Sequence, residues 1–162
     1  MYILGHAGIT LYAARAVDPE IDWRAPVALS LLPDALDKPV RWLWPHLVHF
    51  STRNYGHTLL AWLAVLAVCA ALRGRLKHPW LLWACFAGHA VLDRMWLGEN
   101  VARFFWPLLG PFPPPTFSTT VWTHAFIYDV IGEAIGLALL LRLAAKGKAA
   151  PEGGLSASKR TD

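Results

Sequence analysis

Apolar residues occur along this chain in long runs separated by short polar, basic or proline-rich segments, a pattern typical of an all-helical protein. The runs cover residues 3–17, 25–32, 58–72, 79–97 and 124–143. A helix over 3–17 is about 22 Å long at ~1.5 Å per residue, which is short for a full membrane span. The run 25–32 is shorter still, and the Pro- and Asp-rich residues 33–39 end it. It therefore predicts a half-helix or re-entrant segment.

The segments between the runs predict loops and turns. Residues 40–56 mix Arg, Trp and His and predict an interfacial loop with a short helix, whereas 73–78 predict a tight basic turn. Residues 98–123 are rich in proline and aromatic residues, and the prolines of 107–115 are expected to forbid a regular helix there. A loop of this length predicts a lid or rim. One embedded domain is expected over 1–145, followed by a disordered basic tail over 146–162.

Composition points to a membrane. Hydrophobic residues make up 56% of the chain and charged residues only 16%, where soluble domains carry about a quarter. Basic residues flank the apolar runs in short clusters, which argues against nucleic acid as a partner. Both cysteines lie within apolar runs, so neither a disulfide framework nor a cysteine zinc site is expected, and no cleavable signal peptide is evident. We therefore expect an all-α, multi-pass bundle of about four embedded helices, one or two of them short or re-entrant.

The distribution of positive charge predicts the topology. The basic turn at 73–77 and the C-terminal tail are expected to be cytoplasmic, because cytoplasmic loops carry the excess of Lys and Arg. Residues 79–97 then run outward and the loop 98–123 lies outside. This topology brings one group of side chains to the same depth, near the outer surface: His6, His57, His89, Asp93 and His124.

His89 and Asp93 lie four residues apart, so a helix places them on one face, one turn apart. An imidazole and a carboxylate in this arrangement are half of a metal site. The remaining ligands are expected from His6, His57 and either Asp34 or Asp37. Such ligands suit Zn, Mn or Fe. One ion is expected, or two bridged by Asp93, which would activate water and clamp the oxygens of a phosphoester displacement.

Each of these residues also has a simpler interpretation. His89 and Asp93 could form a buried hydrogen bond without metal, and Asp34 and Asp37 could form a turn and a cap beside Lys38. Arg53 could bind a substrate phosphate or anchor a loop, and Arg94 could be the ion-pair partner of Asp93.

Further candidates to support the ligands or contact substrate are Thr58, Arg94, His124, Asp129 and Glu133. For Asp129 and Glu133, a role in orienting His ligands, capping Arg94 or carrying protons remains open. His46, His49 and His78 are expected to be packed, hydrogen-bonded residues.

Several motifs follow one another in an order that resembles a known family. These are Leu-Pro-Asp-Ala-Leu-Asp at 32–37, Arg-Asn-Tyr-Gly-His-Thr at 53–58, Gly-His-Ala-Val-Leu-Asp at 88–93 and Phe-Trp-Pro at 105–107, after an N-terminal His. Over residues 5–107 the chain is similar to the SOS-linked metal-dependent hydrolases of the bacterial inner membrane, distant relatives of the helical zinc-dependent phospholipases C. The resemblance implies a metal set of His6, Asp34 or Asp37, His57, His89 and Asp93.

The chain departs from these relatives at two points. Thr58 stands where the hydrolase family usually has Ser. His124 and Asp129 are five residues apart and do not reproduce the second His-x-x-x-Glu motif of the soluble phospholipases, which favours one or two ions over three.

The function expected from these observations is hydrolysis of a phosphoester in a lipid or lipid-linked substrate at the outer leaflet. Asp93 and Arg53 are the expected catalytic residues, with Arg53 on the phosphate and the segment 98–117 forming the rim. The alternative is a non-catalytic membrane protein whose buried His/Asp cluster serves ion or proton transport, or helix packing. The oligomeric state stays open.

Overall fold

The computed structural model describes residues 3–49, 51–114 and 119–148, and over these residues the chain is all-helical, as expected. Two 3-10 turns, η1 (Pro45–Val48) and η2 (Tyr55–His57), lie between α2 and α3. The α-helices in chain order are α1 (Ile3–Val17), α2 (Arg24–Leu43), α3 (Leu59–Ala71), α4 (Pro79–Leu92), α5 (Asn100–Phe104) and α6 (Thr119–Lys148).

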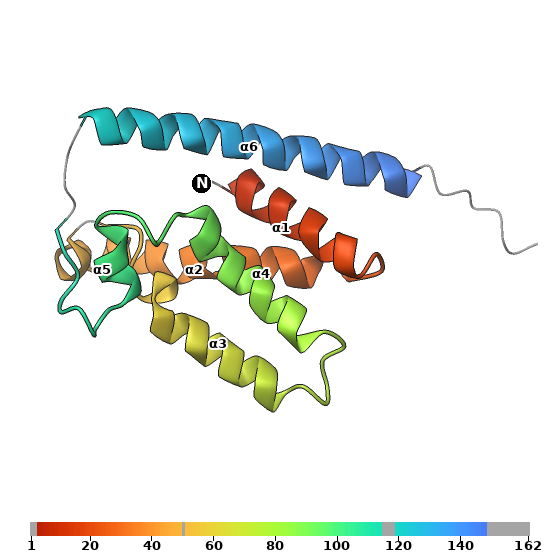
Figure 1. Cartoon of the computed structure of the whole chain (residues 1–162), viewed down its shortest axis with the longest axis horizontal. Coiled ribbons are helices and arrows are strands. Elements are labelled where there is room, and N and C mark those ends of the chain that lie inside the picture. The colour runs from red at the N-terminus through yellow and green to blue at the C-terminus, as the bar shows by residue number, and fades with distance from the viewer. Residues whose placement is uncertain (1–2, 50, 115–118, 149–162) are drawn as a thin grey trace, which may run out of the picture.

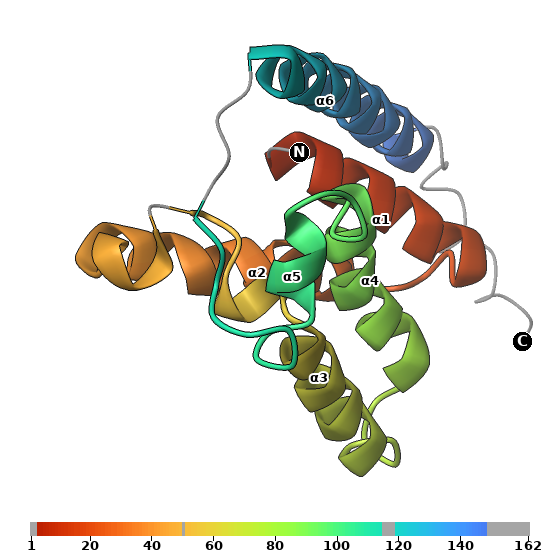
Figure 2. The ribbon, with the colours of Figure 1, turned by 60° about the vertical axis from the view of Figure 1, so that its left-hand side comes forward.

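Helix α1 is the central element of the fold. The long helix α6 runs along one side of it, while α2 and α4 pack against its other side (Figure 1). Helix α3 packs on α4 and extends away from α6 (Figure 2). A small apolar core of Ala14, Ile21 and Cys85, with Leu29 and Leu81 against it, closes the end of the bundle away from the start of α1.

Glycines allow α1 and α6 to approach each other closely. A Cβ atom added at Gly8 would lie 2.2 Å from the carbonyl oxygen of Gly136, and one added at Gly136 would lie 2.2 Å from the carbonyl oxygen of Leu4. Two helices can meet at such short distances only where neither carries a side chain. These two glycines therefore fix where α6 crosses α1.

Helix α2 differs from the predicted half-helix. It continues over 20 residues and contains both Pro33 and Pro39, whereas the sequence predicted that 33–39 would end it. The contacts of α2 with α1, α4 and both 3-10 turns provide the tertiary packing that overrides the local preference of proline. One continuous helix thus carries both Asp34 and Asp37.

Helix α4 ends at Leu92 instead of extending to residue 97, and Asp93 is its C-cap. Arg94 adopts the left-handed conformation with φ of 55°. The amide of Met95 donates to the carbonyl of Ala90 and the amide of Arg94 donates to that of Val91. This hydrogen-bond pattern is the Schellman motif that terminates many helices.

The last part of the chain also differs from expectation. The segment 98–123 contains the short helix α5, which ends before the prolines begin, and α6 starts at Thr119 and continues to Lys148. The helix α6 was predicted over 124–143 only. Most of the predicted tail, residues 149–162, lies outside the described residues.

Many large apolar side chains are exposed on the described surface. They include Leu60 and Leu63 on α3, Trp80 on α4, and Phe126 and Ile131 on α6. Among the described helices, however, we find none that is both long enough and apolar enough to cross a membrane, in contrast to the four embedded helices expected from the sequence. Helices α1, α3 and α4 have only 15, 13 and 14 residues.

Candidate metal centre

Asp37 is fully buried on α2 and holds the segment that carries His57. Its carboxylate accepts hydrogen bonds from the amide of Asn54 at 2.6 Å, the amide of Gly56 at 2.8 Å and Nδ1 of His57 at 2.6 Å. A Cβ atom on Gly56 would lie 2.6 Å from the carbonyl oxygen of Pro33, so this close approach requires glycine. Because a carboxylate only accepts hydrogen bonds, the proton of His57 lies on Nδ1.

His89 on α4 is oriented in the same way by a backbone group. Its Nδ1 donates to the carbonyl oxygen of Ser30 on α2 at 2.5 Å, and a carbonyl oxygen also only accepts. His89 and His57 are both fully buried. In their neutral forms, both rings therefore present an unprotonated Nε2 to their surroundings.

These two Nε2 atoms lie 3.0 Å apart. Two lone pairs that face each other at this distance repel unless a cation or a shared proton lies between or beside them. Histidine ligands of metal ions show this arrangement, in which Nδ1 donates to a carboxylate or carbonyl and Nε2 binds the ion. The donor set and its outer hydrogen bonds thus fit a metal ion, and they also fit a proton shared by the two rings.

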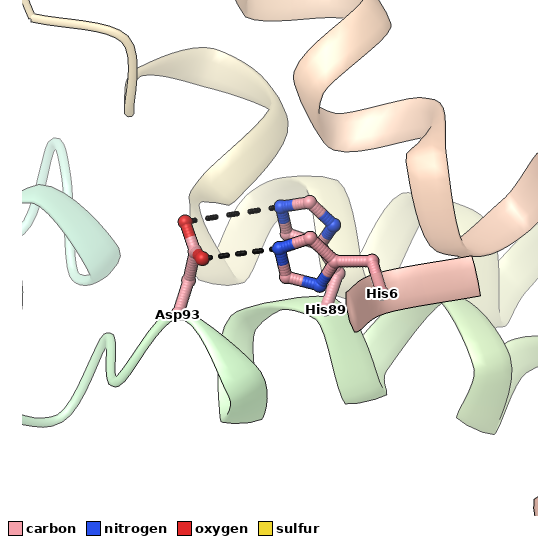
Figure 3. A group of neighbouring side chains, drawn as sticks. All are labelled: His6, His89 and Asp93. Atoms are coloured by element: carbon pink, nitrogen blue, oxygen red, sulfur yellow. Dashed lines mark hydrogen bonds and ion pairs between the residues drawn. The ribbon is translucent and has the colours of Figure 1, made fainter. Parts of the chain in front are cut away.

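His6 on α1 and Asp93, at the end of the helix that carries His89, complete the cluster (Figure 3). Nε2 of His6 lies 3.2 Å from one carboxylate oxygen of Asp93, and Nε2 of His89 lies 3.9 Å from the other. The rings of His6 and His89 are stacked with their centroids 3.8 Å apart. Nδ1 of His6 is buried and has no hydrogen-bond partner, so this ring has a polar atom still to be satisfied.

Asp34 lies near the Nε2 atoms of His57 and His89, whereas Asp37 contacts Nδ1 of His57. Oδ1 of Asp34 lies 3.8 Å from Nε2 of His57 and 3.9 Å from Nε2 of His89, while its Oδ2 accepts from Lys38. Two overlapping groups could each hold a metal ion, His6 with His89 and Asp93, and Asp34 with His57 and His89. His89 belongs to both groups, so the geometry can accommodate one ion or two.

Arg53 connects the cluster to the surface. Its Nε donates to Oδ2 of Asp93 at 2.7 Å, and its side chain is 31% exposed where that of Asp93 is 4% exposed. Burial alone would raise the pKa of Asp93, but its contacts with the rings of His57 and His6, which favour the carboxylate when those rings carry a proton towards it, and the charge of Arg53 hold it well below its ordinary value. Asp93 is therefore ionised at neutral pH and available to a cation.

The carboxylates also determine the charge preference at His57. Burial lowers the pKa of His57, but its hydrogen bonds with Asp37 and Asp93 and the charges of these carboxylates outweigh burial, so the pKa is raised overall. The same negative field that favours a proton on this ring also favours a metal cation beside it.

The remaining predicted residues lie around the cluster or apart from it. Thr58 caps α3, where its hydroxyl accepts a hydrogen bond from the amide of Ala61. The guanidinium of Arg94 lies over the ring of Tyr128 at 4.0 Å.

The three predicted residues on α6 have different surroundings. His124 is exposed, and neither candidate metal group contains it. The half-buried Asp129 lies close enough for its charge to raise the pKa of Arg53. Glu133 binds backbone amides of α1.

Arg53 takes the ion-pair role that the sequence left open for Arg94. Its guanidinium donates to Asp93, while that of Arg94 stacks on Tyr128. Of the three histidines expected to be packed, hydrogen-bonded residues, His46 and His49 are exposed, whereas His78 contacts Asp18, with Nε2 and Oδ2 2.9 Å apart.

Four residues that support the site were not identified from the sequence. Ser30 acts through its backbone carbonyl, which leaves no trace in residue type, and Tyr128 acts from a helix that carries no ligand. Asn54 is fully buried, and Arg103 is 1% exposed, with its guanidinium donating to the carbonyls of Arg53 and Pro113. A signal was present for Asn54, because it lies between Arg53 and His57 in the motif that the sequence singled out.

The fold and the cluster define the class as an all-helical protein that buries imidazole and carboxylate groups at the meeting point of four chain segments. Residues 1–155 match the model of the YdjM inner membrane protein family. The chain belongs to this family, which confirms the inner-membrane part of the resemblance. No curated protein and no solved structure gave a match.

Proposed function

We propose that this protein is a metal-dependent hydrolase that cleaves a phosphoester in a lipid or lipid-linked substrate. The observation that supports this most strongly is that the Nε2 atoms of His57 and His89 lie 3.0 Å apart while both Nδ1 atoms already donate to other groups. Carboxylate oxygens of Asp34 and Asp93 lie within 4 Å of both Nε2 atoms, and the ring of His6 stacks on that of His89. Nitrogen and oxygen ligands without thiolate favour Zn, Mn or Fe.

The residues that would hold the ion are His6, Asp34, His57, His89 and Asp93. Asp37 would orient His57 from outside the ligand shell, since its three hydrogen bonds are to Asn54, Gly56 and His57. A divalent cation held there supplies Lewis-acid polarisation of a phosphoryl oxygen and an activated water at neutral pH. Fixed tautomers and buried carboxylates keep the ligands in place without rearrangement.

Arg53 is the residue best placed to hold the phosphate. It is the most exposed member of its ion pair and carries a guanidinium, whose donors match phosphate oxygens. Its Nε donates to Asp93 at 2.7 Å, and the backbone carbonyl of Arg53 accepts in turn from Arg103. The side chain can thus contact a substrate at the surface while it remains tied to the cluster.

A lipid or lipid-linked substrate is supported by the family and by the surface. Tyr55, two residues after Arg53 in the chain, is exposed, and its ring packs edge-on against Trp106 and Phe112. Apolar surface beside a polar site is the arrangement expected of an enzyme that receives its substrate from a membrane. We place the protein at the bacterial inner membrane, with its site facing the outer leaflet.

A second candidate function is proton transfer through the cluster. The groups Asp37, His57 and His89 form a continuous buried chain of hydrogen-bond distances, as proton relays do. Glu133 gives less support to proton transfer than the sequence suggested, because both of its carboxylate oxygens accept hydrogen bonds from backbone amides of α1. Liposome flux measurements separate this function from hydrolysis.

The test is metal analysis of the purified full-length protein together with a phosphodiesterase assay on a lipid phosphodiester. We expect bound Zn, Mn or Fe, loss of hydrolysis on chelation, and recovery when metal is restored. His89→Ala should abolish both binding and hydrolysis, whereas Arg53→Lys should leave metal binding intact and weaken hydrolysis. Undiminished hydrolysis after complete metal removal, or in His89→Ala, would refute the proposal.

A further inference from the structure

Helix α6 carries no member of either candidate metal group, yet it contacts both segments that supply the His6–Asp93 pair. One contact is at the start of α1 and the other at the end of α4. These contacts come from Glu133 and Tyr128, five residues apart on α6.

Glu133 binds the first turn of α1. One of its carboxylate oxygens accepts from the amide of Leu4 at 3.1 Å and the other from the amide of Gly5 at 2.7 Å. The first amides of a helix have no partner within the helix, and a carboxylate there also interacts favourably with the helix dipole. His6 is the next residue in the chain, so Glu133 fixes the turn that directs this imidazole towards Asp93.

Tyr128 binds the other segment. Its hydroxyl donates to the carbonyl of Leu92 at 2.9 Å, immediately before Asp93, and its ring lies under the guanidinium of Arg94 at 4.0 Å. Arg94 holds the left-handed position that ends α4. Tyr128 therefore contacts the residues on both sides of Asp93 in the chain, Leu92 and Arg94.

The glycine crossing makes this arrangement rigid. Gly8 and Gly136 bring the two backbones together one turn from the Glu133 contacts, so α6 cannot shift along α1 without losing them. Geometry of this kind, in which an outer group fixes the direction of a ligand, changes metal affinity without touching the ion.

We infer that α6 is a positioning helix, whose Glu133 and Tyr128 hold His6 and Asp93 at the separation that the metal requires. This inference rests on the proposed function, because it assigns these residues a role in metal binding. Glu133 acts through His6, and Tyr128 acts through Asp93. Neither is a catalytic residue.

The test measures Zn²⁺ affinity of the full-length protein by titration, with no substrate present. Glu133→Ala should raise the Zn²⁺ dissociation constant by roughly 10–100-fold, the range for loss of an outer partner of a ligand. Glu133→Gln keeps the size and one acceptor oxygen and should lie between wild type and Glu133→Ala. Tyr128→Phe should weaken binding as well, because it removes the hydrogen bond to the residue before Asp93.

Two comparisons separate positioning from general stability. Asp22→Ala is the matched control, because it removes a carboxylate that accepts an amide near the start of α2, and Zn²⁺ affinity should stay unchanged. In a His6→Ala background, Glu133→Ala should weaken Zn²⁺ binding no further. Wild-type affinity in Glu133→Ala, or an undiminished effect without His6, would overturn the positioning role alone. Absence of Zn²⁺ binding in the wild type would overturn the proposed function with it.

Discussion

Asp34 and Asp37 lie almost one turn apart on α2 and have different surroundings. Asp37 is fully buried and accepts three hydrogen bonds from the segment 54–57, whereas Asp34 is half-buried, pairs with Lys38 and lies near the Nε2 atoms of His57 and His89. The sequence left open which of the two is a ligand. The geometry favours Asp34 beside the ion and Asp37 behind His57, because Asp34 lies near Nε2 of His57 and Asp37 engages its Nδ1.

This division of roles gives a prediction for Asp37. In Asp37→Asn, an amide NH₂ replaces one acceptor and faces a backbone amide or Nδ1–H, so a buried donor loses its partner. We expect a loss of about 1–3 kcal/mol in the free energy of unfolding and a roughly 10–100-fold weaker affinity for Zn²⁺. Thermal unfolding and metal titration measure the two effects.

Asp34→Asn is the matched comparison. It should weaken Zn²⁺ binding while changing the stability of the metal-free protein little, since the Lys38 pair it breaks is partly exposed. Equal loss of stability in the two variants would contradict the different roles assigned to these carboxylates.

At the scale of elements, the crossing of α1 and α6 depends on two small residues. Gly8→Ala or Gly136→Ala places a methyl group 2.2 Å from a backbone oxygen of the other helix, so the helices must move apart. We expect destabilisation of about 1–3 kcal/mol, measured as a lower midpoint of thermal unfolding. Gly88→Ala is the control, because nothing lies within 4 Å of its added Cβ, and alanine there should be neutral or stabilise α4 by about 0.5–1 kcal/mol.

A second element contact, between the end of α1 and the α3–α4 turn, should depend on pH. The hydrogen bond from Lys77 is the main reason that the pKa of Asp18 is lowered, and His78 adds to it. A lowered pKa in the folded state means that the stabilisation is fully present above the ordinary value of 3.8 and is lost as pH falls through the folded pKa. The thermal midpoint of Asp18→Asn should therefore lie below that of wild type at pH 7.

The same comparison at low pH provides the check. The difference between wild type and Asp18→Asn should shrink as the pH is lowered below about 4. A difference that stays constant from pH 7 down to the acid limit would show that the Asp18 charge contributes nothing to this contact.

For the whole molecule, the sequence predicted the all-helical class and the group of residues at the site more successfully than the course of the helices. His6, His57, His89 and Asp93 could be selected because each is a polar residue in or beside an apolar run, which requires a partner. The continuous α2 could not be predicted, because the packing that keeps Pro33 and Pro39 helical comes from segments distant in sequence.

The outer partners of the ligands were equally hidden from the sequence. The carbonyl of Ser30 and the hydroxyl of Tyr128 act at sequence separations of 59 and 36 residues, and no local pattern records such contacts. Glu133 was identified as a costly charge in an apolar helix, but its partners are backbone amides of α1, which any residue type could supply. These partners of Glu133 could therefore be found only from the fold.

The most direct test of a metal centre built on His57 and His89 is X-ray absorption at the zinc edge of the zinc-loaded, full-length protein. We predict a shell of nitrogen and oxygen at about 2.0–2.1 Å with imidazole features and no sulfur at about 2.3 Å, and loss of bound zinc in the His57→Ala/His89→Ala double variant. Failure of the wild type to retain zinc, or an unchanged spectrum in the double variant, would contradict the site.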